Sequence, residues 1–231
     1  PYLLSYTTPM NALKYLVRGI DFDFDFGRVD AIRTAFNLNG SYMWRKSGSN
    51  NYMFWNKITG TDYSKYPHMG VFSPDYETDY SERLATNLRV IHNIPQIGLV
   101  VTLTANVIWK DRSWKSYGND SIPIKYISRL DGKLYDFNPD DIDNEEFIGI
   151  DRRSTVNPTR LIREGVMPPL LTMNLNITKE IRDFLKVSFF ANNMFRSTPL
   201  WESKKNPGSY TRRNTTENVF FFGLELTAII R

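Results

Sequence analysis

The stretch from Gly19 to Arg45 alternates apolar and polar residues with a period of two, and this pattern constrains the fold most strongly. Its first part reads GIDFDFDFG, so phenylalanines and aspartates fall on opposite sides of an extended chain. Residues 34–44 resume the alternation after a short polar connection. The pattern predicts a β-hairpin with one apolar face and one polar face.

The same alternation recurs along the chain and predicts an all-β protein of about eight antiparallel strands. No segment shows the helical spacing of apolar residues. The predicted strands lie near residues 2–8, 14–27, 33–45, 82–92, 98–110, 170–179, 185–195 and 217–230, within one domain that covers 1–231.

Charge and residue usage exclude several functions. The 29 basic and 25 acidic residues are spread along the 231-residue chain without a basic block, so nucleic-acid binding is not predicted. The chain has no cysteine, which excludes disulfides and thiol catalysis. No phosphate-binding glycine loop or zinc-protease motif is present, and no enzymatic activity is predicted. The weak alternative is a hydrolase that uses His68 with Asp75 or Asp79.

The predicted connections alternate between short and long. Short ones lie near residues 28, 94 and 181, whereas residues 46–80, 111–168 and 196–215 form long ones. The polar faces are rich in Asn, Thr and Ser rather than Lys and Glu. Both features favour a transmembrane β-barrel with short periplasmic turns, long extracellular loops, apolar side chains toward lipid and polar ones toward the lumen.

The polar side of these strands carries charged residues that a barrel would turn inward. The residues predicted to face the lumen are Asp21, Asp23, Asp25, Arg33 and Arg89. With a turn at 28–30, Asp25 lies across from Arg33 and the two are expected to pair. Arg18 shares the side of the phenylalanines, so it is expected to reach beyond the apolar band.

Three segments resemble the last barrel strands of TonB-dependent outer-membrane receptors of the SusC/RagA type. They are YLVRGIDFDFDFGRVDAIRTAFNLNGSY, PPLLTMNLNITKEIRDFLKVSFFANNMF and FFFGLELTAIIR. The resemblance implies that the chain is the C-terminal portion of a barrel of about 22 strands, without the plug domain. It also implies a place in the outer membrane of a Gram-negative, Bacteroidetes-like cell.

The same resemblance implies the active uptake of a large glycan or peptide. The implied partners are outer-membrane lipid, a SusD-like surface lipoprotein, and the TonB energy-coupling complex, which would act through the N-terminal part. No cofactor is implied.

Aromatic residues in the long connections are candidate ligand contacts, because their faces stack on sugar rings and apolar groups. The candidates are Tyr52, Trp55, Tyr63, Trp114, Tyr117 and Trp201. The alternatives are that they pack the loops together or contact a lid protein.

The segment DFNPDDIDNEE, residues 136–146, has oxygen-bearing side chains at spacings similar to a calcium loop. The weak calcium candidates are Asp136, Asn138, Asp140 and Asp143. The EF-hand pattern fails, because Asp141 stands where that motif needs glycine. A solvated acidic loop is the alternative.

Two other functions stay open at this point. A complete eight-stranded outer-membrane barrel would act as an adhesin or anchor, and a soluble β-sandwich would act as a binding module.

Overall fold

The computed structural model describes residues 11–55, 65–74, 77–117, 122–152, 164–182, 184–197, 199–212 and 219–228. Within them, the all-β, antiparallel prediction is confirmed, and the only helices are short 3₁₀ turns. In this part of the chain, no helix is long and apolar enough to span a bilayer. The predicted strand near residues 2–8 lies outside the described residues.

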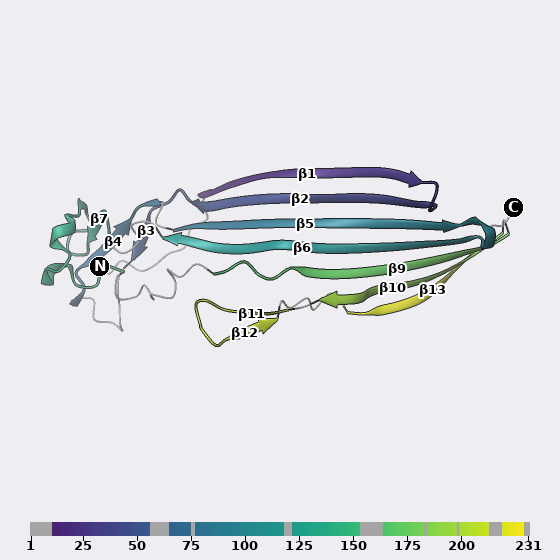
Figure 1. Cartoon of the computed structure of the whole chain (residues 1–231). Coiled ribbons are helices and arrows are strands. Elements are labelled where there is room, and N and C mark those ends of the chain that lie inside the picture. Colours follow the sequence, from purple (N-terminus) through teal and green to yellow (C-terminus); the bar gives the residue numbers. More distant parts are fainter. Residues whose placement is uncertain are drawn as a thin grey trace. The chain divides into compact units, whose positions relative to one another are not determined.

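Seven strands form one sheet in chain order (Figure 1). They are β1 (Leu13–Val29), β2 (Thr34–Ser49), β5 (Glu77–Ile94), β6 (Leu99–Tyr117), β9 (Leu170–Ile181), β10 (Leu185–Ser197) and β13 (Phe221–Ala228). Each overlaps a segment predicted from the sequence. However, β5 begins earlier and β6 ends later than predicted, so the sheet is longer than the sequence indicated.

The connections alternate in length. A turn at 30–33 joins β1 to β2, the 3₁₀ helix η3 (Pro95–Ile97) lies between β5 and β6, and residues 182–184 join β9 to β10. Because the strands are antiparallel and paired in chain order, these short connections lie at one end of the sheet and the long ones at the other.

The first turn differs from its prediction. The amide of Arg33 donates to the Asp30 carbonyl oxygen at 3.2 Å, so the turn covers 30–33 and Arg33 belongs to it. The carboxylate of Asp25 accepts from the amide of Gly27 at 2.9 Å. The predicted Asp25–Arg33 pair is therefore wrong. Gly27 has a positive φ of 64°, yet β1 continues through it to Val29.

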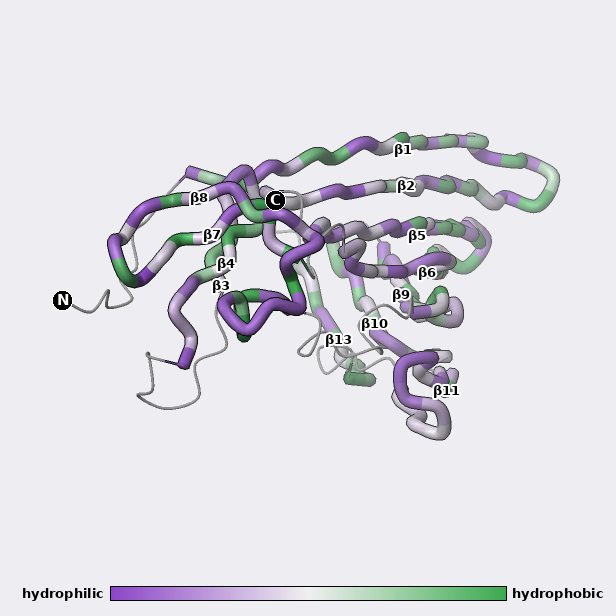
Figure 2. Tube along the Cα trace, turned by 90° about the vertical axis from the view of Figure 1, so that its left-hand side faces the viewer, coloured by the Kyte–Doolittle hydropathy of each residue, from purple (hydrophilic) through white to green (hydrophobic). Residues whose placement is uncertain are grey.

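Side chains alternate between an apolar face and a polar face of this sheet. The β6–β9 register pairs apolar residues on one face and polar residues on the other. The apolar pairs are Val101–Ile177, Leu103–Leu175 and Ala105–Met173, and the polar pairs are Thr102–Asn176, Thr104–Asn174 and Asn106–Thr172. The alternation is also visible along β1 and β2 in Figure 2.

By their contacts, the residues divide into two compact units. Unit 1 comprises residues 1–17, 45–81 and 113–164. Unit 2 comprises residues 18–44, 82–112 and 165–231. The strands β1, β2, β5 and β6 contribute residues to both.

Unit 1 contains a second antiparallel sheet, of four short strands. They are β3 (Met53–Trp55), β4 (His68–Phe72), β7 (Lys125–Ser128) and β8 (Leu134–Asp136), followed by the 3₁₀ helices η4 (Pro139–Asp141) and η5 (Glu145–Phe147). Phe72 and Ile150 are fully buried, and Ile150 packs with Phe137 and Phe147. The prediction that 46–80 and 111–168 are only loops is thus wrong, because their apolar residues form a core of their own.

Unit 2 is a single layer of strands, with a small hairpin of β11 (Leu200–Glu202) and β12 (Tyr210–Arg212). Among its described residues, the only buried hydrophobic ones are Leu170 and Ala191. The apolar face of unit 2 therefore has no second layer of protein to cover it within the described residues.

We predict that Gly40→Ala destabilises the sheet by about 1–3 kcal/mol. A Cβ at Gly40 would lie 2.7 Å from the carbonyl oxygen of Ala85 and 2.6 Å from the ring of Phe22. The matched control is Gly48→Ala in the same strand, where the nearest atom is 3.6 Å away. Urea unfolding of the two variants measures the difference, and equal midpoints would contradict the prediction.

Candidate functional site

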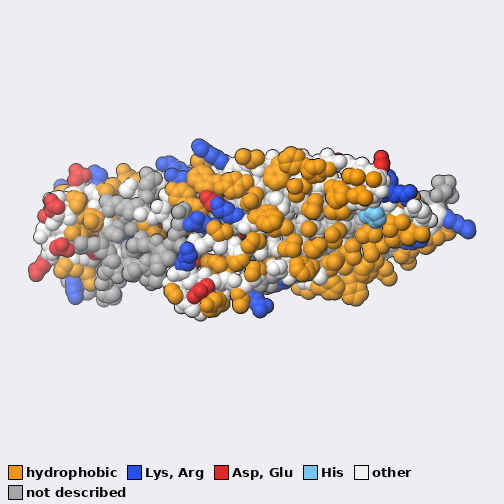
Figure 3. Space-filling model, in the orientation of Figure 1, with side chains coloured by type: hydrophobic (Ala, Val, Ile, Leu, Met, Phe, Trp, Pro, Cys, Tyr) orange, Lys and Arg blue, Asp and Glu red, His pale blue; other side chains and the backbone are white. Residues whose placement is uncertain are grey.

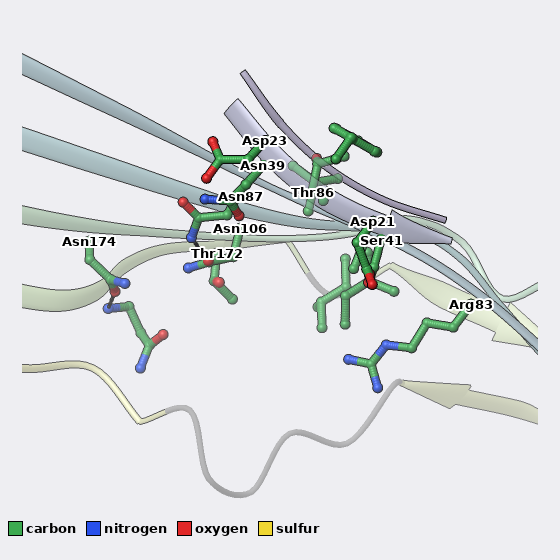
Figure 4. Close-up of a pocket in the computed structure, with 17 residues that line it drawn as sticks. Asp21, Asp23, Asn39, Ser41, Arg83, Thr86, Asn87, Asn106, Thr172 and Asn174 are labelled. Carbon is green, nitrogen blue, oxygen red and sulfur yellow. Dashed lines mark hydrogen bonds between the residues drawn. The ribbon is translucent and has the colours of Figure 1, made fainter. Parts of the chain in front are cut away.

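A groove of about 870 Å³ lies on the polar face of unit 2. Residues of β1, β2, β5, β6, β9 and β10 line it, so most of the sheet contributes (Figure 4). Its polar lining consists of Asp21, Asp23, Asn39, Ser41, Arg83, Thr86, Asn87, Asn106, Thr172, Asn174 and Asn193. A surface of this composition offers hydrogen-bond donors and acceptors in close succession.

Amide side chains form a row across adjacent strands of this groove. Asn87 Nδ2 on β5 donates to Asn106 Oδ1 on β6 at 2.5 Å. On the next strand, Asn174 Oδ1 accepts from the backbone amide of Asn193 at 2.8 Å. Asn193 has a positive φ of 54° where the β9–β10 register shifts, so this bond holds an irregular point of the sheet.

Opposite charges face the same groove. Asp23 accepts a hydrogen bond from Asn37 Nδ2 at 2.8 Å. In contrast, the side chains of Asp21 and Arg83 make no hydrogen bond or ion pair with any other described residue. The charged side chains of Asp21 and Arg83 and the asparagine side chains of the groove suit a polar ligand that carries hydrogen-bond donors and acceptors of its own.

The sequence-predicted charges separate in the structure. Asp21 and Asp23 line the groove. Asp25 shares their side of β1 but is bonded to its own strand, Arg33 lies in the turn, and Arg89 is an exposed residue of β5 outside the groove lining.

Sequence reasoning missed Arg83 and the row of asparagines as groove residues. The polar faces were predicted to be rich in Asn, but nothing in one sequence says that the strands of Asn87 and Asn106 pair in this register. Their position in the alternation was the available signal, since it puts Arg83 on the same side of β5 as Asn87.

Two of the aromatic candidates pack within unit 1. The guanidinium carbon of Arg152, which is buried, lies 5.5 Å from the centre of the Trp55 ring. Trp114 stacks on Tyr80 with ring centres 5.3 Å apart and an interplanar angle of 10°. Each contact covers one face of the ring, so both residues make packing contacts within unit 1.

The remaining aromatic candidates are dispersed. Tyr52 is exposed, Tyr117 is half-buried, and Tyr63 lies outside the described residues. Trp201 lines a second, smaller pocket of about 300 Å³ in unit 2, with Asp111, Met167, Pro168, Pro199, Thr211 and Arg212. Trp201 is therefore the candidate that borders a cavity.

The calcium candidates do not converge. The Asp136 carboxylate is 2.6 Å from Lys125 Nζ, and this hydrogen bond raises the pKa of Lys125. The Asn138 side chain accepts from the amide of Asp140 at 3.3 Å at the start of η4, and Asp143 is an exposed residue after it. In the part of the chain that the structure describes, no group of three or more acidic, histidine or cysteine residues could hold a metal ion.

His68 lies beside Glu146 rather than Asp79. It is 3% exposed, with Nε2 3.3 Å from Glu146 Oε1 and its ring edge-on to Tyr126. Asp79 instead lies 3.5 Å from Lys115 Nζ, and Asp75 is outside the described residues. The alternative pairing of His68 with Asp79 is wrong, because His68 belongs to the packed interior of unit 1.

Comparison with known protein families, with curated proteins and with solved structures finds no match.

We predict that Trp55→Ala destabilises unit 1 by about 2 kcal/mol, because it removes the aromatic face over a buried guanidinium. Tyr52→Ala is the control, since Tyr52 is 49% exposed on the segment just before β3. Limited proteolysis should cut the Trp55 variant within unit 1 faster than the Tyr52 variant. Equal cleavage rates would indicate that Trp55 is not a packing residue.

Proposed function

We propose that this chain forms part of an outer-membrane β-barrel receptor that binds and imports a large polar nutrient. In this proposal the apolar face of the seven-stranded sheet contacts lipid, and the groove on the polar face belongs to the path of the ligand. The observation that carries the proposal is the exposed apolar face of unit 2, which has almost no buried core.

The extent of that face supports lipid as its environment. Phe222 is 67% exposed, and Leu224 and Leu226 are each 72% exposed. Leaving such a side chain in water forfeits about 2 kcal/mol each. In Figure 3 hydrophobic side chains gather over the long strands, and most charged side chains lie outside this area. A face of this kind is stable only when an apolar medium or a partner covers it.

Charged residues mark both limits of the apolar face. On the described strands of unit 2, its side chains between the level of Arg18 and that of Lys179 carry no charge. The stretch from Leu99 to Trp109 on β6 extends about 33 Å along the strand. With the usual tilt of barrel strands this corresponds to a height of about 25 Å, which matches the apolar band of such barrels.

The polar face supports an enclosed, water-filled interior. Its asparagines and threonines bond to one another, as Asn87 does to Asn106 and Thr178 to Ser188. In the described sheet β1 and β13 are edge strands, and β1 is 17 residues long. Long unpaired edges favour closure by further strands, because an exposed edge invites aggregation. A SusD-like lipoprotein and the TonB complex remain the proposed partners.

The soluble sandwich is less well supported, since a sandwich needs a second sheet packed about 10 Å from the apolar face. The four-stranded sheet belongs to unit 1 and has its own core. A small closed barrel that acts as an adhesin or anchor is the second candidate. Insertion of this chain alone, as a monomeric barrel, would favour it over the receptor.

Single-cysteine variants test the membrane assignment cleanly, because the chain has no cysteine of its own. We expect Phe24→Cys and Val101→Cys in membranes to resist a water-soluble maleimide, since lipid excludes it. The matched polar-face variants Asp23→Cys and Thr102→Cys should react at least tenfold faster, which corresponds to about 1.4 kcal/mol. The measurement is mass-spectrometric labelling of the protein in isolated outer membranes.

Solubility without detergent then distinguishes the receptor from the soluble module. Equal labelling of all four cysteines in a protein that stays in solution without detergent would contradict the receptor and support the soluble module. Labelling confined to the polar face, together with ligand uptake that fails in Arg83→Ala, would support passage of ligand along the groove.

A further inference from the structure

Arg18 is a cation on the apolar face of β1, in line with Ile20 and Phe22. Its neighbour Gly19 lies against β2, where an added Cβ would be 2.7 Å from the Tyr42 carbonyl oxygen. Arg18 thus stands beside the part of β2 that holds Tyr42. This level is at the end of β1 away from the turn, that is, at the end of the sheet with the long connections.

Two further charges at this level neutralise each other. Lys110 Nζ lies 2.5 Å from Glu82 Oε2 and 5.9 Å from the centre of the Tyr42 ring. The guanidinium group of Arg18, by contrast, makes no hydrogen bond or ion pair with any other residue that the structure describes. The row of Arg18, Tyr42, Glu82 and Lys110 therefore has a net charge of about +1, and the Arg18 guanidinium is its unneutralised part.

The opposite limit of the apolar face is built differently. Lys179 is paired in register with Leu99 and Val187, so it also lies on this face. Its ammonium group donates to the carbonyl oxygen of Ile97 in the short connection. The chain thus satisfies its own cation at the short-connection end but not at the long-connection end.

We propose that Arg18, with the hydroxyl of Tyr42, binds the phosphate group of an anionic lipid headgroup at the long-connection end of the barrel. This inference rests on the proposed function, since it needs the apolar face to lie in a membrane. A guanidinium offers two parallel N–H donors that match a phosphate, and a phenol adds a third donor. Ile20 and Phe22 continue from Arg18 along the apolar face, where the acyl chains of the same lipid would lie.

The test uses the whole protein extracted from outer membranes in detergent and stripped of lipid. Phosphatidic acid and diacylglycerol with the same acyl chains are titrated, and native mass spectrometry counts the bound lipid. Arg18→Gln should weaken phosphatidic acid binding about fivefold, as expected for one cation near a membrane surface, and leave diacylglycerol unchanged. Tyr42→Phe should give a smaller loss of the same kind.

Lys179→Gln is the matched control, because it removes a cation of the same face that already has a partner. It should leave the preference for phosphatidic acid intact. An Arg18→Gln protein with unchanged preference would overturn the inference. Inorganic phosphate that competes as well as the lipid would also overturn it. An Arg18→Gln protein that loses thermal stability but keeps its lipid preference would overturn it too, and would assign Arg18 to an ion pair within the protein.

Membrane integration separates this inference from the proposed function. A protein that resists alkaline extraction from membranes but does not distinguish the two lipids refutes the phosphate site alone. A protein that alkaline treatment releases into solution refutes both.

Discussion

The apolar face of a single-layer sheet is the constraint on which the structure of unit 2 depends. A sheet with one apolar face must bury it against another layer, close on itself, or meet an apolar solvent. Unit 2 buries only Leu170 and Ala191 among its described hydrophobic residues. Cross-strand packing cannot replace a second layer, because side chains on one face of a single sheet touch only their neighbours in that sheet.

The polar face of the sheet is subject to a related constraint, because its polar groups need hydrogen-bonding partners. Polar groups on this face, opposite the apolar one, must be satisfied by water or by each other. Asn87 with Asn106 and Thr178 with Ser188 do so through neutral hydrogen bonds between adjacent strands. Uncharged pairs of this kind cost less to remove from water than a matching set of ions would, because desolvating an ion is far more costly. The few unpaired charges, such as Arg83, then stand out as groups available to a ligand.

The long strands could be predicted from the sequence because alternation with period two is a direct imprint of a sheet with two different faces. The alternation of Phe22, Phe24 and Phe26 with aspartates is compatible only with a β-strand that has one apolar and one polar side. The turn at 30–33 was misplaced because Gly27 has the positive φ of a turn residue yet lies inside β1. Turn position depends on which residues pair across the strands, and a single sequence does not contain that information.

The four-stranded sheet of unit 1 was missed for another reason. Its strands are three to five residues long, too short to establish a period. The Asp131-Gly132 pair between β7 and β8 was the available signal for a hairpin, and Gly132 indeed has a φ of 72°. The groove residues were not predicted for a related reason. They come from six strands, and the register of those strands decides which asparagine side chains lie close together.

The two units depend on their surroundings in opposite ways, although one chain forms both. Unit 1 buries Phe72 and Ile150 completely and so gains its stability from contacts inside the protein, as water-soluble domains do. Unit 2 leaves Phe222 and Leu224 largely exposed, so under the proposed function its stability would depend on the lipid that covers them. Under the proposed function, removing that lipid should weaken the seven-stranded sheet while the core around Ile150 persists. A chain of this kind can hold its long connections in a defined fold before its strands reach the environment that stabilises them.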